Sequence, residues 1–205
     1  MSFVLATANP DKAREIAEIL AGRVELTPRP SEVPDVEETG ETLVDNARLK
    51  AHALSAATGL PAIADDTGLE VAALDGAPGV YSARYAGESA TYADNVAKLL
   101  EELQGKAGAQ ARRARFATAA VAAWPDGTEL VAEGAVSGWI AARAAGSGGF
   151  GYDPVFVPAE GDGRTFAQLV DEDPAAKHRL SHRARAFEAL ADALDRKTGP
   201  SAAAV

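Results

Sequence analysis

Two adjacent aspartates directly follow a short apolar run, and this pair constrains the fold more than any other feature of the sequence. Residues 62–64 predict a β-strand, and Asp65 and Asp66 follow it before the turn-forming pair at 67–68. Neighbouring carboxylates repel each other, and a sheet interior tolerates neither unless a partner satisfies it. If the strand includes Asp65, the two side chains diverge, so that one faces a cleft and the other braces the turn. The alternative is that both only form the turn.

The composition limits the function classes. The chain has 205 residues, with 47% hydrophobic and 24% charged residues, as in soluble globular proteins. We expect no membrane contact, because no apolar run reaches a spanning length and the N-terminus lacks the features of a secretory signal. The absence of cysteine excludes disulfides and thiol chemistry and fits the cytoplasm. The net charge of −10 argues against nucleic-acid binding.

Strand-like and helix-like segments alternate along the chain, which predicts an α/β fold with a hairpin elaboration. Asn9 and Pro10 suit the start of a helix whose apolar stripe runs through Ala13, Ile16, Ala17 and Leu20. We expect further helices at about 42–58, 91–104 and 181–196, strands at 3–6 and 61–64, a hairpin about residues 125–127, and irregular segments at 27–41 and 76–90. Residues 146–158 predict a glycine-rich loop that enters a short strand. No linker divides residues 1–205, which we interpret as one domain with a frayed end at 199–205.

Two lysines are candidates for binding phosphate. Lys12 falls in the first turn of a helix, where a cation opposes the helix dipole unless an anion binds there. Lys50 lies beside the apolar stripe of the predicted helix 42–58 and reaches either into a cleft or out to solvent.

Acidic residues gather near the same predicted strand end. Glu37, Glu38 and Glu41 precede the helix that carries Lys50, and Asp65 and Asp66 follow the strand. Carboxylate oxygens without histidine or cysteine suit Mg²⁺, with Mn²⁺ as a substitute.

A basic segment and a glycine-rich loop complete the candidates. Residues 177–185, KHRLSHRAR, concentrate positive charge at a helix start marked by Ser181, which predicts an anion or base-edge contact or a solvated basic patch. The sequence GGFGYD places Phe150 and Tyr152 among glycines beside Asp153, where an aromatic ring can stack on a base.

Five motifs in order resemble the non-canonical purine nucleoside triphosphate pyrophosphatases, the inosine triphosphatase-like family. They are TANPDK, EETGETLVDNARLKA, AIADDTGLEVAALDGAPGVYSARYAG, GGFGYDPVF and SHRARA, and the resemblance spans residues 4 to about 190. It implies a two-lobed α/β homodimer, a mixed β-sheet flanked by helices, with the active site in the cleft between the lobes. It also implies Mg²⁺-dependent hydrolysis of ITP, XTP and dITP to the monophosphate and pyrophosphate. The sequence departs from the family at Ala8, where glycine is usual, and at Thr67, which replaces serine.

The resemblance also implies roles for individual residues. Glu38 and Asp66 bind the metal with Asp65 as a further ligand, and Asp66 activates the attacking water, with Asp65 as the second candidate. The triphosphate is held by Thr7, Ala8, Asn9, Pro10, Asp11, Lys12 and Lys50. The nucleotide is contacted by Thr67, Phe150, Gly151, Tyr152, Asp153, Lys177, His182 and Arg183.

Hydrogen-bond polarity predicts which base is preferred. Lys177 and Arg183 only donate and Asp153 accepts, which matches a base with an oxygen at position 6 and a hydrogen on N1. We therefore expect preference for ITP and XTP over ATP. Two alternatives remain: a Maf-like nucleotide pyrophosphatase of different base specificity, and a catalytically silent nucleotide-binding regulator.

Overall fold

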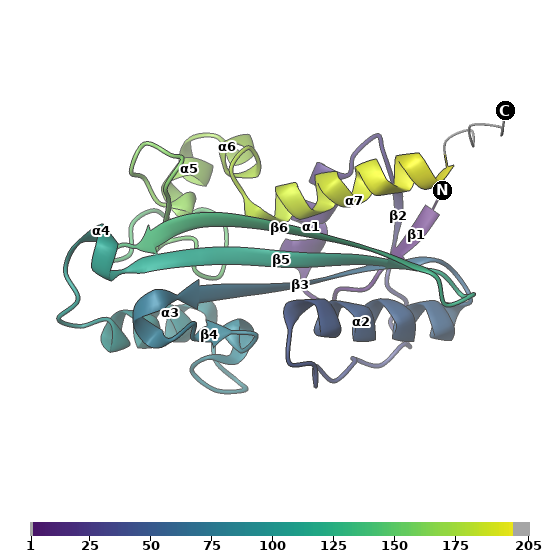
Figure 1. Cartoon of the computed structure of the whole chain (residues 1–205), viewed down its shortest axis with the longest axis horizontal. Coiled ribbons are helices and arrows are strands. Elements are labelled where there is room, and N and C mark those ends of the chain that lie inside the picture. The colour runs from purple at the N-terminus through teal and green to yellow at the C-terminus, as the bar shows by residue number, and fades with distance from the viewer. Residues whose placement is uncertain (1, 199–205) are drawn as a thin grey trace, which may run out of the picture. The chain divides into compact units, whose positions relative to one another are not determined.

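The predicted alternation of strands and helices is present in the computed structural model, which describes residues 2–198 (Figure 1). The strands are β1 (Ser2–Leu5), β2 (Glu25–Pro28), β3 (Ala62–Val71), β4 (Pro78–Gly79), β5 (Arg113–Ala123), β6 (Glu129–Ile140) and β7 (Phe156–Pro158). The α-helices are α1 (Pro10–Ile19), α2 (Leu43–Thr58), α3 (Tyr92–Glu102), α4 (Gly108–Ala111), α5 (Phe166–Glu172), α6 (Pro174–His178) and α7 (His182–Thr198). Short 3-10 helices lie at Ala72–Leu74 and Ser82–Arg84.

The strands form one mixed sheet, as the resemblance implied. Their order is β2-β1-β3-β5-β6-β7, and β4 pairs with β3. β1 runs parallel to both β2 and β3, whereas β4 is antiparallel to β3 and β7 is antiparallel to β6. The predicted hairpin is confirmed, because β5 and β6 are neighbours and the Trp124 N–H donates to Thr128 O at 2.9 Å across the turn.

The chain divides into two compact units. Among the described residues, unit 1 contains 2–66, 119–134 and 185–198, and unit 2 contains 67–118 and 135–184. The division falls inside β3, β5 and β6, so each of these strands contributes residues to both units. The frayed end predicted at 199–205 lies outside the described residues.

Unit 1 has apolar clusters on both faces of its strands. α1 and α7 pack on one face, where Ile16, Leu20, Phe187 and Leu190 meet Ile63. α2 covers the other face, and Figure 1 shows it across the strands from α7. Its buried residues Ala47, Ala51 and Leu54 pack against Ala62 and Ala64. The strand residues therefore alternate between the two helical layers.

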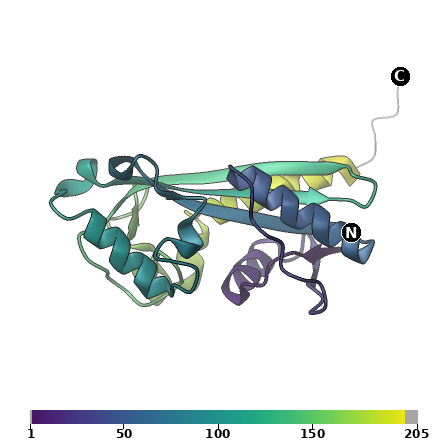
Figure 2. The ribbon, with the colours of Figure 1, turned by 90° about the horizontal axis from the view of Figure 1, so that it is seen from below.

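Unit 2 is built around a third cluster. Leu99 of α3 and Leu103, the residue after it, pack with Phe116 of β5 and Phe156 of β7, and α5 adds Phe166. Figure 2 shows α3, drawn in teal, on one side of the strands of this unit.

Local caps explain where the predicted helices begin and end. Asn9 caps α1 by accepting from the N–H groups of Asp11 and Lys12, and Pro10 occupies the first turn. Thr42 caps α2, which ends at Gly59 in the left-handed conformation, so the predicted bounds are confirmed. Ser181 Oγ accepts from the Ala184 N–H at 3.0 Å at the start of α7.

Several predictions about local structure were wrong. The predicted turn at residues 65–68 does not exist, because β3 continues through it to Val71. β2 occupies the start of the segment predicted to be irregular, where Pro28 ends a strand that pairs on one side only. Helices α4, α5 and α6 were not predicted. Ala17, assigned to the buried stripe of α1, is exposed. Among the helices between residues 2 and 198, none combines the length and apolar character that a membrane span needs.

Candidate active site

The parallel pairing of β1 and β3 brings the first candidate loop beside the two aspartates. Leu5 pairs with Ile63, and the Ala6 N–H donates to Ile63 O at 2.7 Å. The carboxyl ends of parallel strands lie at one edge, so the loop that starts at Thr7 leaves the sheet next to Asp65.

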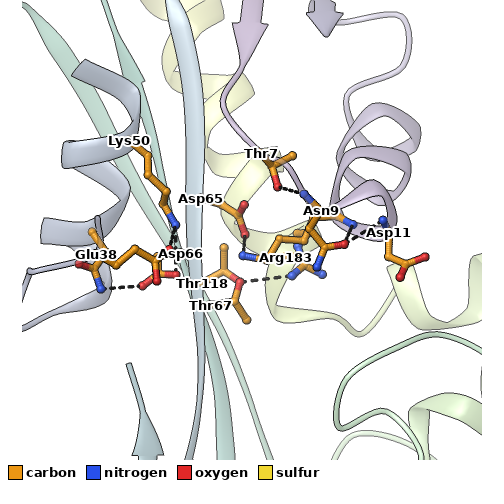
Figure 3. Close-up of polar contacts among 12 residues, drawn as sticks. Thr7, Asn9, Asp11, Glu38, Lys50, Asp65, Asp66, Thr67, Thr118 and Arg183 are labelled. Atoms are coloured by element: carbon orange, nitrogen blue, oxygen red, sulfur yellow. Dashed lines mark hydrogen bonds and ion pairs between the residues drawn. The ribbon is translucent and has the colours of Figure 1, made fainter. Parts of the chain in front are cut away.

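The two aspartates point to opposite faces of β3, as expected for successive strand residues (Figure 3). Asp65 pairs with Lys12 of α1, with Nζ and Oδ2 3.2 Å apart. Asp66 pairs with Lys50 of α2, with Nζ and Oδ1 3.3 Å apart. The two residues are 2% and 5% exposed, so each is buried against a lysine from a different helical layer. The prediction of divergence is confirmed, and the prediction that one of them braces a turn is wrong because the strand continues.

Lys50 joins two of the candidate carboxylates. Its Nζ lies 2.7 Å from Glu38 Oε1 as well as 3.3 Å from Asp66 Oδ1. Burial alone would lower the pKa of Lys50, but the charges of Asp66, Asp65 and Glu38 outweigh it and raise that pKa. The lysine reaches the carboxylates rather than solvent, which decides between the two interpretations of its position. Glu37 and Glu41, the other acidic residues of this loop, are exposed.

Asp66 sits in an environment that disfavours its charge. Burial raises its pKa above the ordinary value, while the charges of Lys50 and Lys12 lower it, and burial prevails. A second donor reaches this carboxylate from α2, because Asn46 Nδ2 lies 3.2 Å from Asp66 Oδ2.

The loop from Thr7 to Lys12 is held by its own side chains. Thr7 Oγ1 accepts from the Asn9 N–H at 3.1 Å, and Asp11 pairs with Arg14 at 2.9 Å. Pro10 and Ala8 are exposed. A hollow of about 540 Å³ in unit 1 is lined by Thr7, Ala8 and neighbouring residues: Leu5, Ala13, Pro28, Arg29, Pro30, Ser31, Val33, Pro34 and Asp35.

Unit 2 contains a buried ion pair among the candidates from the glycine-rich loop and the basic segment. Lys177 Nζ lies 2.7 Å from Asp153 Oδ2, and both side chains are at least 97% buried. The Phe150 N–H also donates to Asp153 Oδ2, at 2.9 Å. Gly149 is required here: its φ is +72°, and a Cβ would lie 2.1 Å from Asp153 Oδ2.

The Phe150 ring lies near both Lys177 of this pair and Arg183, the other cation among the predicted nucleotide contacts. Lys177 Nζ lies 4.8 Å from the Phe150 ring centroid, and Arg183 Cζ lies 5.4 Å from it. Arg183 Nη2 donates to Thr67 Oγ1 at 3.3 Å, and Thr67 shares a 2.7 Å hydrogen bond with Thr118 (Figure 3). The structure therefore gathers five predicted nucleotide contacts: Thr67, Phe150, Asp153, Lys177 and Arg183.

Three other predicted nucleotide contacts lie outside this set of five residues. Tyr152 packs in the core of unit 2, and its hydroxyl donates to Ser82 O at 2.9 Å. The buried His182 ring stacks on Phe116 with centroids 4.4 Å apart. Gly151 has a positive φ of +62°, with open space where a Cβ would stand. Their roles toward a nucleotide stay predictions.

The carboxylates fit a metal that takes few protein ligands. Among residues 2–198, no group of three or more histidine, aspartate or glutamate side chains is arranged to hold a metal ion. Glu38 and Asp66 do share one cation, the Lys50 ammonium, whereas Asp65 faces the other side of β3. Mg²⁺ usually binds through one or two carboxylates together with water and phosphate oxygens, so this pair suits it.

Comparison with known proteins decides the family. Residues 3–193 match the Ham1 family. The chain belongs to this family. The resemblance of the five motifs to the inosine triphosphatase-like enzymes is thereby confirmed.

Relatives of this Ham1-family chain are named for one activity. A protein from Rhodospirillum centenum named dITP/XTP pyrophosphatase is 47% identical over 191 residues, or 92% of each chain. One of the same name from Thermus thermophilus is 48% identical over 202 residues, covering 98% of this chain and 94% of the relative. A HAM1 protein structure from Coxiella burnetii matches with a TM-score of 0.83 and 41% identity over 96% of this chain and 99% of that one.

Two polar residues of this Ham1-family site were not predicted from the sequence. Thr118 supplies the hydroxyl partner of Thr67, and nothing in the alanine-rich run around it indicates this role. Asn46 was missed although a signal exists: it lies one helical turn before Lys50, so both side chains reach the same side of α2.

Proposed function

We propose that this chain hydrolyses non-canonical purine nucleoside triphosphates, namely ITP, XTP and dITP, to the monophosphate and pyrophosphate. The observation that carries the proposal is the contact of Lys50 with Glu38 and with the buried Asp66, which offers positive charge for phosphates beside carboxylates for a metal and a water. The names of the relatives support the same reaction.

In this proposal Asp66 accepts the proton of the attacking water. A base works best when its pKa lies near the operating pH, and burial moves the pKa of Asp66 upward, in that direction. The oxygen of the water then bonds to phosphorus as the bond to the leaving phosphate oxygen breaks. Lys12 and Lys50 contact triphosphate oxygens and neutralise charge on them, with Thr7, Ala8, Asn9, Pro10 and Asp11 shaping the loop around Lys12.

We propose Mg²⁺ as the cofactor, with Mn²⁺ as a substitute, held by Glu38 and Asp66 and with Asp65 nearby as a further carboxylate. Burial leaves Asp66 short of compensating charge even with two lysines near, so a divalent cation suits the position. Such a cation neutralises charge that develops on phosphate oxygens during transfer.

We propose that the unit 2 residues recognise the base. Arg183 and Lys177 donate to an oxygen at position 6, Asp153 accepts from N1–H, and the Phe150 ring stacks on the base. Thr67, Gly151, Tyr152 and His182 complete this set. Adenine presents the reverse polarity and leaves these polar groups unpaired, which discriminates strongly.

We also propose that the chain works as a homodimer in the cytoplasm, as the family resemblance implies. Light scattering coupled to size-exclusion chromatography tests the dimer, and a mass of one chain would contradict it.

Pyrophosphate release from a nucleotide panel tests the proposed function. We expect ITP, XTP and dITP to release pyrophosphate with Mg²⁺ and to release none after chelation, and ATP to react far more slowly. Binding of ITP without turnover would instead indicate a nucleotide-binding regulator. Turnover of modified pyrimidine nucleotides in preference to ITP would indicate a Maf-like specificity.

A further inference from the structure

Asn46 is a buried amide that bonds two parts of unit 1 at once. Its Oδ1 accepts from the Gly40 N–H at 2.8 Å, and its Nδ2 donates to Asp66 Oδ2 at 3.2 Å. The residue is 0% exposed. The backbone N–H of Gly40 can only donate, so it fixes the amide with the oxygen toward Gly40 and the NH₂ group toward Asp66.

The hydrogen bond between Asn46 and Gly40 also restrains the position of Glu38. Gly40 and Glu38 lie two residues apart in the loop before α2, and Glu38 Oε1 contacts Lys50 Nζ at 2.7 Å. Lys50 in turn contacts Asp66 Oδ1, so Asn46 and Lys50 take different oxygens of the same carboxylate. The result is a closed ring that runs from Asp66 through Asn46 and Gly40 to Glu38 and back through Lys50.

Gly40 has no room for a side chain in this ring. A Cβ on Gly40 would lie 2.6 Å from the Asp45 Cβ and 2.7 Å from Asn46 Oδ1. The close approach of the loop to Asn46 therefore depends on glycine at this position.

α3 offers an internal comparison. Both helices begin with the pattern T-x-x-D-N, Thr42 to Asn46 in α2 and Thr91 to Asn95 in α3, and both threonines cap their helix. Asn95 is 2% exposed and also ties the preceding segment, because its Oδ1 accepts from the Ala86 N–H at 2.7 Å and its Nδ2 donates to Ala83 O at 2.9 Å. The second bond differs: Asn95 donates to a backbone carbonyl, whereas Asn46 donates to a carboxylate.

We propose that Asn46 is the positioning residue of the active site. It orients the Asp66 carboxylate and holds the loop that carries Glu38, so that one side chain sets both carboxylates. This inference rests on the proposed function. Groups that orient a catalytic or metal-binding carboxylate typically contribute about 10–100-fold to activity or metal affinity.

Two substitutions separate the two bonds. Asn46→Ala removes both. Asn46→Asp keeps an acceptor for the Gly40 N–H but replaces the donor to Asp66 with a repelling carboxylate. We expect kcat for ITP to fall about 10–100-fold in both variants with little change in KM, because Asn46 orients the reacting carboxylate. Amide hydrogen exchange at Gly40, measured without nucleotide, should accelerate in Asn46→Ala and stay slow in Asn46→Asp.

Asn95→Ala is the matched control. It removes a buried asparagine at the same helix position, so we expect lower thermal stability and faster exchange at Ala86 with kcat retained.

Wild-type kcat in Asn46→Asp, or unchanged Gly40 exchange in Asn46→Ala, would overturn the proposal. If Asn46→Asp does not fold, Asn46→Ala decides alone. Unchanged kcat or unchanged Gly40 exchange then overturns the proposal, and a lower kcat with faster exchange supports it. Failure of the proposed function is distinct, because the wild-type protein then releases no pyrophosphate from ITP, and the exchange data still decide whether Asn46 holds the loop.

Discussion

Asp65 and Asp66 are consecutive residues of one strand, yet their carboxylates meet different lysines on opposite faces of that strand. Asp65 contacts Lys12 of α1, and Asp66 contacts Lys50 of α2. Each helix thus delivers one cation to one carboxylate, and Glu38 adds a second carboxylate only on the Lys50 side.

The asymmetry predicts unequal effects of two otherwise similar substitutions. We expect Asp66→Asn to lower kcat by about a thousandfold or more, because the lost carboxylate contributes several kcal/mol of transition-state stabilisation. Asp65→Asn is the matched variant. Asp65 is buried, adjacent to Asp66 and paired with a lysine, but it lies on the face of β3 without Glu38, so we expect a smaller fall in kcat. Steady-state kinetics with ITP measure both. A larger fall in kcat in Asp65→Asn would indicate that Asp65, not Asp66, is the base.

The pH dependence of stability gives a second prediction. Burial raises the pKa of Asp66, partly opposed by Lys50 and Lys12, so the folded protein holds this proton more tightly than the unfolded chain does. The stabilisation from protonation is full below the unfolded pKa and is lost as the pH rises through the folded pKa. Asp66→Asn removes this titration, so the Tm of the wild-type protein should fall relative to that of the variant as the pH rises from acid to neutral. Thermal melting in chelator from acid to neutral pH measures this difference, and a wild-type Tm that does not fall relative to that of the variant would contradict the argument.

The two lysines predict a distinction between nucleotides. Lys12→Ala and Lys50→Ala should each weaken binding of ITP more than binding of IMP, because their proposed partners are oxygens of the longer phosphate chain. Calorimetry in chelator, where turnover stops, compares the two ligands. Lys98→Ala, which removes a lysine of α3 outside the predicted site, is the control and should change neither affinity. An equal loss of affinity for ITP and IMP would show that Lys12 and Lys50 do not bind the triphosphate.

Base selection is best tested at Arg183. Lys177 is a poorer choice, because removing it would leave Asp153 buried without its ion-pair partner, at a cost of about 3–5 kcal/mol in stability. Arg183→Ala should lower the ratio of kcat/KM for ITP to that for ATP. Phe150→Ala should lower both values alike, because a ring stacks on any base. If Arg183→Ala leaves the ratio unchanged, the base is recognised by other residues.

Much of the fold was predictable because its signals are local. The caps at Asn9 and Thr42 and the glycine at position 59 set helix bounds through hydrogen bonds and dihedral angles that nearby residues determine. The hairpin about residues 125–127 followed from a turn sequence between two apolar runs.

The continuation of β3 was not predictable from local sequence. Aspartate, threonine and glycine at 65–68 all favour turns. A strand forms there instead, because partners from elsewhere in the fold satisfy the polar groups. Lys12 and Lys50 reach the carboxylates, and Thr118 reaches Thr67. These partners are distant in sequence, so only the packed structure indicates them.

The candidate site, like the fold, was only partly predictable from the sequence. The charged residues stand out by type and spacing. The sequence left open whether Lys50 reaches a cleft or solvent, and only the structure places it against Glu38 and Asp66. Asn46 did not stand out, because its spacing from Lys50 indicates only that both side chains reach the same side of α2, and an uncharged amide does not indicate which groups it bonds. Its role depends on the Gly40 loop folding back to it.

The products formed from ITP distinguish release of pyrophosphate from removal of a single phosphate. Phosphorus NMR of ITP incubated with the wild-type protein and Mg²⁺ should show IMP and pyrophosphate in equal amounts. Asp66→Asn should form no detectable product in the time that the wild-type protein needs to consume the ITP. Release of orthophosphate with IDP, or equal turnover by the wild-type protein and Asp66→Asn, would contradict the account.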